Sequence, residues 1–323
     1  MTNKYPSNLS LSDDLLLQQN QNGTASKQRL ECLICNYRID PRDESLFVTF
    51  PCNVRAFRDE KFKVWRCPNC RTIHCLDIVD LDRYYAKYPI AQAVAHDSAR
   101  ACYKNILKRL KKHGFDKNHT FLDYGCGGNG LFVKYLQELG FANVRGYDPY
   151  SPHPEFNNAK ILEPGKFDYI LLQDIIEHVE DPHTLLSELD NLLAPGGYIL
   201  VATPNADNID LSQPNLAEYY NEVHVPYHLH MYTQQTLELL GKQQNWEVVS
   251  FFERPFHDLL FGMNSRMWNQ YVRLFDGSLD VIYEPSQPVK ALTSLKFIFY
   301  MIFGYWLSFK TNMAVMFRKK NLG

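Results

Sequence analysis

From Thr120 onward, short apolar runs alternate with longer segments in which apolar side chains recur at helical spacing. Apolar runs bounded by turn residues indicate buried strands, and their alternation with amphipathic helices indicates repeated βα units. We therefore expect an α/β fold with a doubly wound, mostly parallel sheet and helices on both faces. The expected strands are Thr120–Tyr124, Val144–Asp148, Asp168–Leu172, Tyr198–Thr203, Trp246–Phe252 and Met313–Phe317. The expected helices are Leu131–Leu139, Thr184–Leu193 and Thr233–Gln244.

The first third of the chain has a different pattern. Residues 1–27 are rich in Gln, Asn and Ser with few aromatic side chains, which predicts a disordered tail. Residues 28–80 carry short runs of Val, Phe and Trp between two cysteine pairs, which predicts a small β module. Apolar side chains at helical spacing predict linker helices over residues 81–115. The α/β domain then covers residues 116–323, with a helical insertion at about 255–310.

Composition and charge limit the partners and the compartment. The chain has 323 residues, and 34 basic side chains against 36 acidic ones give a formal charge of −2. Such a balance disfavours a polyanion bound through net charge, so we expect no nucleic acid partner. The N-terminal segment shows no apolar run of the signal-peptide type, and we expect a cytoplasmic protein with reduced cysteines.

A glycine-rich turn follows the first expected strand, in the sequence FLDYGCGGNGLF. Gly125, Gly127 and Gly130 fit the pattern GxGxxG, which lets the backbone approach a nucleotide at a helix N-terminus. Asp148 lies at the end of the next expected strand, where a carboxylate can bind ribose hydroxyls. The alternatives are a plain strand-to-helix turn for the glycines and a surface turn for Asp148. We expect a nucleoside site.

Asp123 indicates which nucleoside the site favours. It lies two residues before Gly125, at the tip of the expected strand. A carboxylate there repels a pyrophosphate but attracts an ammonium or a sulfonium, which favours S-adenosylmethionine over NAD. An NAD-dependent oxidoreductase is the alternative enzyme. The non-enzymatic alternative is a zinc-ribbon interaction protein on a degenerate cofactor fold.

Five segments in order carry a family resemblance: FLDYGCGGNG, GYDPY, FDYILLQDIIEHVEDP, LLAPGGYILVATPN and PYHLHMYT. Together they resemble class I S-adenosylmethionine-dependent methyltransferases with a Rossmann-like fold, in particular those with EHV, PGG and HLH motifs. The resemblance implies methyl transfer from S-adenosylmethionine. It also implies methionine and loop contacts for Asp123, Gly125 and Gly127, a ribose contact for Asp148, and a place at the pocket rim for Gln173 and Asp174.

Histidines are the candidates for accepting a proton from a methyl acceptor that carries a hydroxyl. His178 belongs to the EHV motif, and His228 and His230 form the HLH motif. Both motifs should lie at the carboxyl edge of the sheet, where open α/β folds bind ligands. We expect these three as catalytic candidates. Helix capping or a bond to a backbone carbonyl is the alternative for each, and it is stronger for His224.

Two CxxC pairs, separated by 31 residues, can supply the four sulfur donors of a tetrahedral zinc ion. We therefore expect structural zinc in the N-terminal module. Asn36 and Arg71 stand where such turns often have glycine. The alternatives are two pairs of reduced, partly buried thiols, or a ligand set that includes His74 or Cys75. The expected ligands are Cys32, Cys35, Cys67 and Cys70.

The N-terminal module also bears on the acceptor. Its segments WRCPNC and IVDLDRYYAKY resemble those of N-terminal zinc ribbons that accompany some sugar methyltransferases, and this resemblance implies that the module shapes the acceptor site with Tyr84, Tyr85 and Tyr88. We expect a small-molecule or glycan-type acceptor, with a sugar or a lipid-linked intermediate included.

One apolar stretch near the C-terminus stands apart. Phe297–Phe309 has no charged residue, but its 13 residues are too few for the ~20 that span a bilayer. We expect a buried helix or a homodimer face. The alternative is peripheral membrane contact through residues 290–310, which would make the protein membrane-associated.

Overall fold

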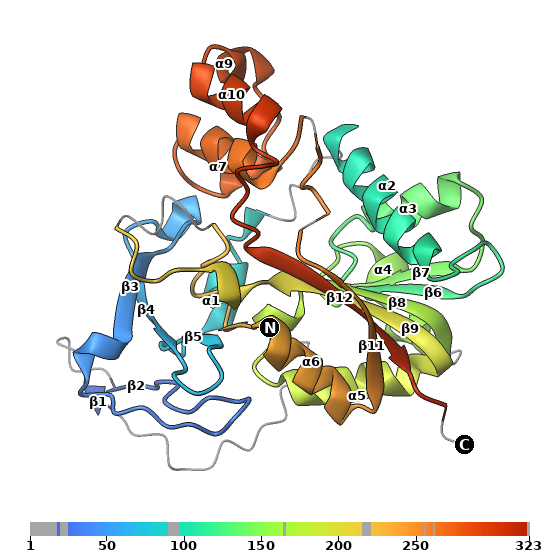
Figure 1. The fold of residues 1–323 in the computed structure, drawn as a ribbon, viewed down its shortest axis with the longest axis horizontal. Coiled ribbons are helices and arrows are strands. Elements are labelled where there is room, and N and C mark those ends of the chain that lie inside the picture. Colours follow the sequence, from blue (N-terminus) through green and yellow to red (C-terminus); the bar gives the residue numbers. More distant parts are fainter. Residues whose placement is uncertain are drawn as a thin grey trace.

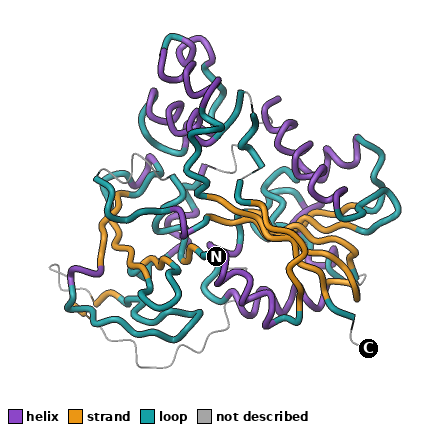
Figure 2. Tube along the Cα trace, viewed as in Figure 1, coloured by secondary structure: helices purple, strands orange, loops and turns teal. Residues whose placement is uncertain are grey.

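The computed structural model describes most of the chain and divides it into two connected parts (Figures 1 and 2). The described residues are 18–19, 25–89, 97–163, 166–214, 221–254, 256–260 and 262–321. The helices are α1 (Leu81–Tyr85), α2 (Asp97–Lys112), α3 (Leu131–Glu138), α4 (Pro154–Asn157), α5 (Pro182–Leu192), α6 (Gln234–Gln243), α7 (Ser265–Leu274), α8 (Asp280–Tyr283), α9 (Pro288–Leu292) and α10 (Leu295–Phe303). The strands are β1 (Gln18–Gln19), β2 (Ala25–Ser26), β3 (Phe47–Pro51), β4 (Lys61–Arg66), β5 (Ile73–Cys75), β6 (Phe121–Tyr124), β7 (Val144–Tyr147), β8 (Phe167–Gln173), β9 (Leu193–Pro204), β10 (His230–Met231), β11 (Trp246–Phe252) and β12 (Asn312–Lys319).

The larger sheet has the strand order β11-β12-β9-β8-β6-β7 in the described part of the chain. The pairs β6/β7, β6/β8 and β8/β9 are parallel, whereas β12 runs antiparallel to both of its neighbours. The expected α/β fold with a mostly parallel sheet is therefore confirmed. The expected strands recur with small boundary shifts, except that β9 starts at Leu193, because Leu193 already pairs with Phe167.

Both faces of this sheet are covered by helices, as Figure 1 shows. Side chains alternate along β9: Ile199 packs with α5 and α6, and Leu200 packs with α2 and α3. The same period of two continues in β12, where Val315 joins the first cluster and Met316 the second. Two apolar layers thus hold the sheet between them and leave its strand ends free to form a site.

The connection after β7 is short. It contains α4 and a 3-10 helix at Ala159–Ile161 before the chain enters β8. In the described residues β7 is the edge strand, next to β6. The four prolines in this segment agree with the abbreviated connection, since proline lacks the backbone donor that strands and helix interiors need.

The N-terminal module is completed by a strand from the α/β domain. Its sheet has the order β10-β5-β4-β3, and β10 pairs antiparallel with β5 through His230 opposite His74. Valines and tyrosines from the segment before β10, Val223, Val225 and Tyr227 among them, share one apolar cluster with the module. The module and the α/β domain therefore share a core as well as a sheet.

The segment between the module and the α/β domain forms two helices, α1 and α2. Pro89 follows α1 closely, and a proline disfavours helical backbone in the residue before it. Residues 90–96 lie outside the described residues. Most of residues 1–27, for which a disordered tail was expected, also lies outside the described residues. Within this range the structure describes the short strands β1 and β2, which pair with each other.

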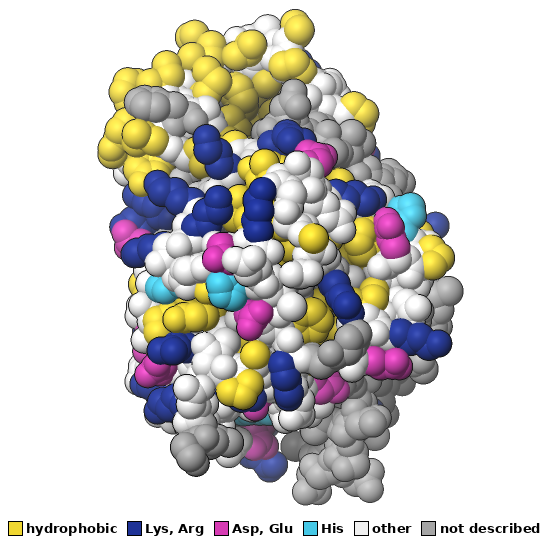
Figure 3. All heavy atoms as spheres, turned by 90° about the vertical axis from the view of Figure 1, so that its right-hand side faces the viewer, with side chains coloured by type: hydrophobic (Ala, Val, Ile, Leu, Met, Phe, Trp, Pro, Cys, Tyr) yellow, Lys and Arg dark blue, Asp and Glu magenta, His cyan; other side chains and the backbone are white. Residues whose placement is uncertain are grey.

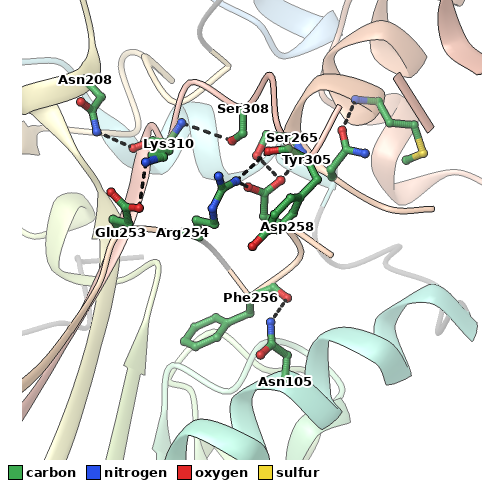
Figure 4. A network of polar contacts seen from close by, with 12 residues as sticks. Asn105, Asn208, Glu253, Arg254, Phe256, Asp258, Ser265, Tyr305, Ser308 and Lys310 are labelled. Carbon is green, nitrogen blue, oxygen red and sulfur yellow. Dashed lines mark hydrogen bonds and ion pairs between the residues drawn. The ribbon is translucent and has the colours of Figure 1, made fainter. Parts of the chain in front are cut away.

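The helical insertion between β11 and β12 contains α7 to α10 and stands at one end of the molecule (Figure 1). A polar network holds its base (Figure 4). Arg254 bonds the carboxylate of Asp258 and the carbonyl of Tyr305, both at 2.8 Å, and Asp258 accepts a bond from the backbone of Ser265 at 3.1 Å. Several side chains of the apolar stretch, Phe299 and Phe303 among them, are exposed in the single chain, so of the two expected forms the fully buried helix does not hold, and the homodimer face stays a prediction.

Candidate active site

A cavity of about 650 Å³ lies where β6, β7 and β8 end. Its lining comes from the glycine turn after β6, the segments after β7 and β8, and the segment before β10. The linker helices and the helical insertion close it from other sides. This volume suits a small molecule. Of the predicted site residues, those that line the cavity are Asp123, Gly125, Gly127, Asp148, Gln173, Asp174, His178 and His228.

The glycine turn has the backbone that its sequence suggests. Gly125, Gly127 and Gly130 have φ values of 80°, 73° and 54°, a region that side chains other than glycine disfavour. A Cβ on Gly125 would clash with Ile175, and one on Gly130 would clash with Phe156. A Cβ on Gly127 would meet nothing within 4 Å. Gly127 therefore faces the cavity, whereas Gly125 and Gly130 permit close packing.

Asp123 is a buried carboxylate at the cavity wall, with 5% of its surface exposed. Its side chain has no hydrogen-bond donor among the residues that the structure describes. Burial, and to a smaller extent the charge of Asp148, raises the pKa of Asp123 to about 7. An unpaired buried carboxylate is costly, and a cationic ligand would offset that cost.

Asp148 ties the end of β7 to the glycine turn. Its carboxylate accepts bonds from the backbone N–H groups of Gly127 at 3.0 Å and Tyr150 at 2.9 Å. Burial raises its pKa, and these backbone bonds act in the opposite direction. These two bonds fix the orientation of the carboxylate beside the cavity. Asp148 is the residue for which a ribose contact was expected from the sequence.

His228 has one ring nitrogen anchored and the other free to act. Its Nδ1 donates to the carbonyl of Glu222 at 2.7 Å, which leaves Nε2 as the unprotonated nitrogen of the neutral ring. Nε2 lies 4.0 Å from Oε1 of Glu177. That oxygen is buried and has no hydrogen-bond partner in the described structure, whereas the other oxygen of Glu177 accepts a bond from Thr203 at 3.0 Å.

His178 lies against the His228 ring, with 4.6 Å between the ring centroids. Its Nδ1 shares a hydrogen bond of 3.0 Å with the hydroxyl of Tyr85. Burial lowers the pKa of His228 to about 4 and raises that of Glu177, so the neutral forms of both are favoured in this cluster. Glu177, His178 and His228 each offer a ligand atom within 4.8 Å of the others, a set that can bind a proton or a divalent cation.

His230 and Gly130 are the predicted site residues that do not line the cavity. His230 lies in β10, and its Nδ1 is 2.9 Å from Nδ1 of His74 in the module. A single residue, Leu229, separates His230 from His228, but the backbone directs the two rings to different places. The structure therefore groups His178 with His228 and leaves His230 at the contact between the two parts of the chain.

Several cavity residues were not singled out from the sequence. Tyr150, just after Asp148, stacks on Tyr85 with 5.9 Å between ring centroids and an angle of 13°. Trp268 and Tyr283 enter from the helical insertion. The sequence position of Tyr150, two residues after the expected ribose contact Asp148, could have indicated that it lies at the cavity. The sequence of the helical insertion contains no such indication for Trp268 and Tyr283, because their position at the cavity depends on tertiary packing.

The four cysteines of the two CxxC pairs come together at the edge of the module. Their sulfur atoms all lie within 4.8 Å of one another, with 3.4 Å between Cys32 and Cys70 and 3.5 Å between Cys35 and Cys67. A tetrahedral zinc ion with Zn–S bonds of about 2.3 Å needs sulfur atoms roughly 3.8 Å apart. The arrangement is therefore close to the size of a zinc site.

Both CxxC turns have the same backbone geometry. Asn36 donates its N–H to the carbonyl of Cys32 at 2.8 Å, and Arg71 donates to Cys67 at 2.9 Å. Asn36 and Arg71 have φ values of 57° and 65°, so they adopt the left-handed conformation that glycine usually provides in such turns. The departures from glycine in the sequence thus leave the shape of the turns unchanged.

Comparison with known proteins agrees with this geometry. Residues 94–251, about half of the chain, match the family model described as a methyltransferase domain. The ubiquinone biosynthesis O-methyltransferases of Caulobacter vibrioides and Pelagibacter ubique are both 34% identical to this chain, over 108 and 122 residues. These matches cover 27% and 32% of this chain and 41% and 50% of the relatives. The chain thus aligns with half or less of the length of these curated relatives.

The solved structures that match this chain include methyltransferases of low identity. The Haemonchus contortus phospholethanolamine N-methyltransferase 2 is 19% identical, with a TM-score of 0.42 and coverage of 68% of this chain and 52% of that one. The Burkholderia thailandensis 1,6-didemethyltoxoflavin-N1-methyltransferase is 13% identical, with a TM-score of 0.42 and coverage of 80% and 96%. The family match and the mixed sheet, rather than these distant superpositions, identify the chain as carrying a class I S-adenosylmethionine-dependent methyltransferase domain.

Proposed function

We propose that this chain transfers the methyl group of S-adenosylmethionine to a small-molecule acceptor, with a glycan-type or lipid-linked molecule included. The observation that carries the proposal is Asp123, a buried carboxylate without a partner that faces the same cavity as the open side of Gly127. A pyrophosphate would be repelled there, whereas the ammonium of S-adenosylmethionine would be attracted. This charge argument favours S-adenosylmethionine over the NAD alternative.

The cavity residues fit S-adenosylmethionine in the following way. Asp123 would accept hydrogen bonds from the ammonium, and Asp148 would accept them from the ribose hydroxyls. The open face of Gly127 would let the ligand approach the backbone, since no protein atom lies within 4 Å of the position of a Cβ there. When bound, S-adenosylmethionine supplies a methyl carbon that is already activated by the sulfonium.

His228 is the proposed proton acceptor. Its free Nε2 would take the proton of an acceptor hydroxyl while the oxygen forms its bond to the methyl carbon and the carbon–sulfur bond breaks. Glu222 holds the ring in the required tautomer through the bond of 2.7 Å to Nδ1. Protonation of the ring would favour the ionised form of Glu177, 4.0 Å away, and that carboxylate would then stabilise the charge of the ring. A hydroxyl acceptor is favoured because the curated relatives are named O-methyltransferases.

The module has the donor set and the size of a structural zinc site, and we propose that Cys32, Cys35, Cys67 and Cys70 bind one zinc ion. The ring of His74 supports this set, because its Nε2 lies 3.2 Å from the sulfur of Cys32. An imidazole N–H donated to a ligand sulfur is a common outer contact of metal sites. The role of the metal would be to hold the module in shape.

Calorimetric titration of the full chain tests the cofactor assignment. We expect S-adenosylhomocysteine, which retains the ammonium and the ribose, to bind, and NAD to show no heat of binding. Asp123→Asn should weaken the binding at least tenfold, by order of magnitude, because it removes a charge-assisted contact. The exposed Asp59→Asn in the module is the matched control and should leave binding unchanged. Tight binding of NAD without binding of S-adenosylhomocysteine would reject the proposal.

A further inference from the structure

One end of the molecule carries an apolar surface that no part of the described chain covers. It belongs to α9, α10 and the turn after α10, which form the tip of the helical insertion (Figure 1). Of the 13 large hydrophobic side chains that are exposed in the described structure, eight lie between residues 289 and 307. We call these eight the apolar tip. They are Val289, Leu292, Leu295, Phe299, Ile302, Phe303, Trp306 and Leu307.

Part of the apolar tip follows one stripe of α10 and the turn after it. Leu295, Phe299, Phe303 and Trp306 recur at helical spacing, and Leu295 is 84% exposed. The opposite side of α10 is also apolar and packs through Phe297 into a cluster with α7. A helix in a protein that only faces water would place polar side chains on its outer stripe. The outer stripe of α10 therefore has a composition suited to contact with something other than water.

The base of the insertion is held firmly, so the exposed tip belongs to an ordered element. Arg254 lies 4.0 Å from the centroid of the Tyr305 ring and bonds Asp258, and Lys310 bonds Glu253 at 2.8 Å (Figure 4). Asn208, in the segment after β9, donates to the carbonyl of Lys310 at 2.9 Å. These contacts attach the insertion to the strands on both sides of it and fix the direction in which the tip points.

Charge and aromatic content distinguish between the partners that could cover this tip. Residues 285–309 contain Lys290 and Lys296 and no acidic residue, and both lysines are exposed. Figure 3 shows the yellow surface at one end of the molecule with basic side chains gathered directly beside it. Trp306 adds an indole of the kind that favours the boundary between lipid and water. An apolar face with aromatic side chains and a basic border is complementary to a lipid surface that carries negative charge.

From these observations we infer that the apolar tip docks on an anionic lipid bilayer, with the tip in the acyl boundary and the lysines at the headgroups. The nine residues of α10 are too few to span a bilayer, and in the described part of the chain no helix is long and apolar enough to do so. The tip therefore lies in the interface. A second copy of the chain is the other occupant that an apolar face could take, but two basic borders would then repel each other.

The apolar tip lies close enough to the cavity for docking on a bilayer to bring the cavity near the lipid surface. Helix α7 lies between them: Trp268 and Asn269 line the cavity, whereas Met267 and Tyr271 pack with Phe297 of α10. Docking would thus place the cavity about one helix diameter, roughly 10 Å, behind the helix that meets the lipid. Docking does not depend on which molecule accepts the methyl group, so it can be tested separately from the proposed function.

Sedimentation with vesicles tests the inference on the full chain. One set of vesicles contains phosphatidylcholine alone, and the other contains about 30% phosphatidylglycerol by composition. We expect sedimentation with the anionic vesicles and weaker binding at high salt. The variant Leu295→Glu/Phe299→Glu/Trp306→Glu should bind at least about tenfold more weakly, because it places charge in the acyl boundary. The control variant Leu139→Glu/Leu239→Glu changes two similarly exposed leucines elsewhere and should bind normally.

Further measurements separate the outcomes. Replacing Lys290 and Lys296 by serine should weaken binding to the anionic vesicles about fivefold for each lysine. Thermal unfolding of each variant should stay near that of the parent chain, since all altered side chains are exposed. Failure of the parent chain to bind anionic vesicles overturns the inference. So does unchanged binding of the triple variant. A parent chain that dimerises in solution, ignores vesicles and becomes monomeric in the triple variant would instead make the tip a dimer face.

Discussion

His74 and His230 meet ring to ring, with their Nδ1 atoms 2.9 Å apart and both side chains buried. His74 also lies 3.2 Å from the sulfur of Cys32, so one line of contacts runs from the cysteine cluster to strand β10. Two residues before His230, His228 faces the cavity. The two histidines of the HLH motif therefore lie in different environments. His228 faces the cavity, and His230 contacts His74 where the module meets the methyltransferase domain.

This arrangement predicts opposite effects for the two histidines of the motif. His228→Ala should lower kcat by about 10² to 10⁴ with little change in the affinity for S-adenosylhomocysteine, because the variant loses a proton acceptor that does not hold the cofactor. His230→Ala should lower the free energy of unfolding by about 2 kcal/mol through loss of buried contacts, with kcat nearly unchanged. Steady-state kinetics and thermal unfolding of both variants check this.

The result would be contradicted if His230→Ala abolished turnover in a folded protein while His228→Ala remained active. Activity should also persist after dialysis without added divalent cations. A need for such a cation would assign Glu177, His178 and His228 to metal binding instead of proton transfer.

The glycine turn predicts a second contrast. Gly127→Ala adds a methyl group on the open, cavity-facing side, so it should weaken binding of S-adenosylhomocysteine, and its left-handed backbone should cost about 1 kcal/mol of stability without any steric clash. Gly130→Ala would push into the ring of Phe156 and should destabilise the protein by about 1 to 3 kcal/mol. Calorimetric binding and thermal unfolding separate the two. Unchanged affinity in a folded Gly127→Ala variant would show that this side of the turn does not approach the ligand.

The sheet could be read from the sequence because its signals are local. The strands β8 and β9 are continuous apolar runs with helices before and after them, and they are buried on both faces. The sequence pointed to the glycines and Asp148 for a similar reason, since each directly follows an apolar run that is a strand in the structure.

Contacts between distant segments could not be read in this way. Nothing local in the segment around His230 shows that it forms a strand against His74, 156 residues earlier in the chain. The apolar stretch after Ser294 reads the same in a core helix and in a surface helix, because burial depends on what packs against it. The exposure of this stretch and the position of His230 share that physical cause.

The cysteine cluster predicts a metal-dependent fold for the module. Full-length protein should contain one zinc ion per chain, and Cys67→Ser should lower both the zinc content and the unfolding temperature, because it removes one of four ligands. Structural zinc binds with a free energy on the order of 10 kcal/mol, so its removal should be clear in thermal unfolding. Metal analysis checks this, with Cys102→Ser as the control, since Cys102 lies outside the cluster. Unchanged zinc content in Cys67→Ser would contradict the assignment.

The raised pKa of Asp123 predicts how cofactor binding depends on pH. Burial raises this pKa from 3.8 to about 7, and only the ionised carboxylate attracts the ammonium of the ligand. Between pH 8 and pH 6 the affinity for S-adenosylhomocysteine should therefore fall by up to about tenfold. The empty protein should show the opposite trend in stability from this group: its free energy of unfolding decreases as pH rises from 4 to 7, because the unfolded chain releases the proton first. Asp123→Asn should bind weakly with a flat profile over this range, and calorimetric titration at several pH values measures both. A slope that persists in Asp123→Asn would show that another group controls binding.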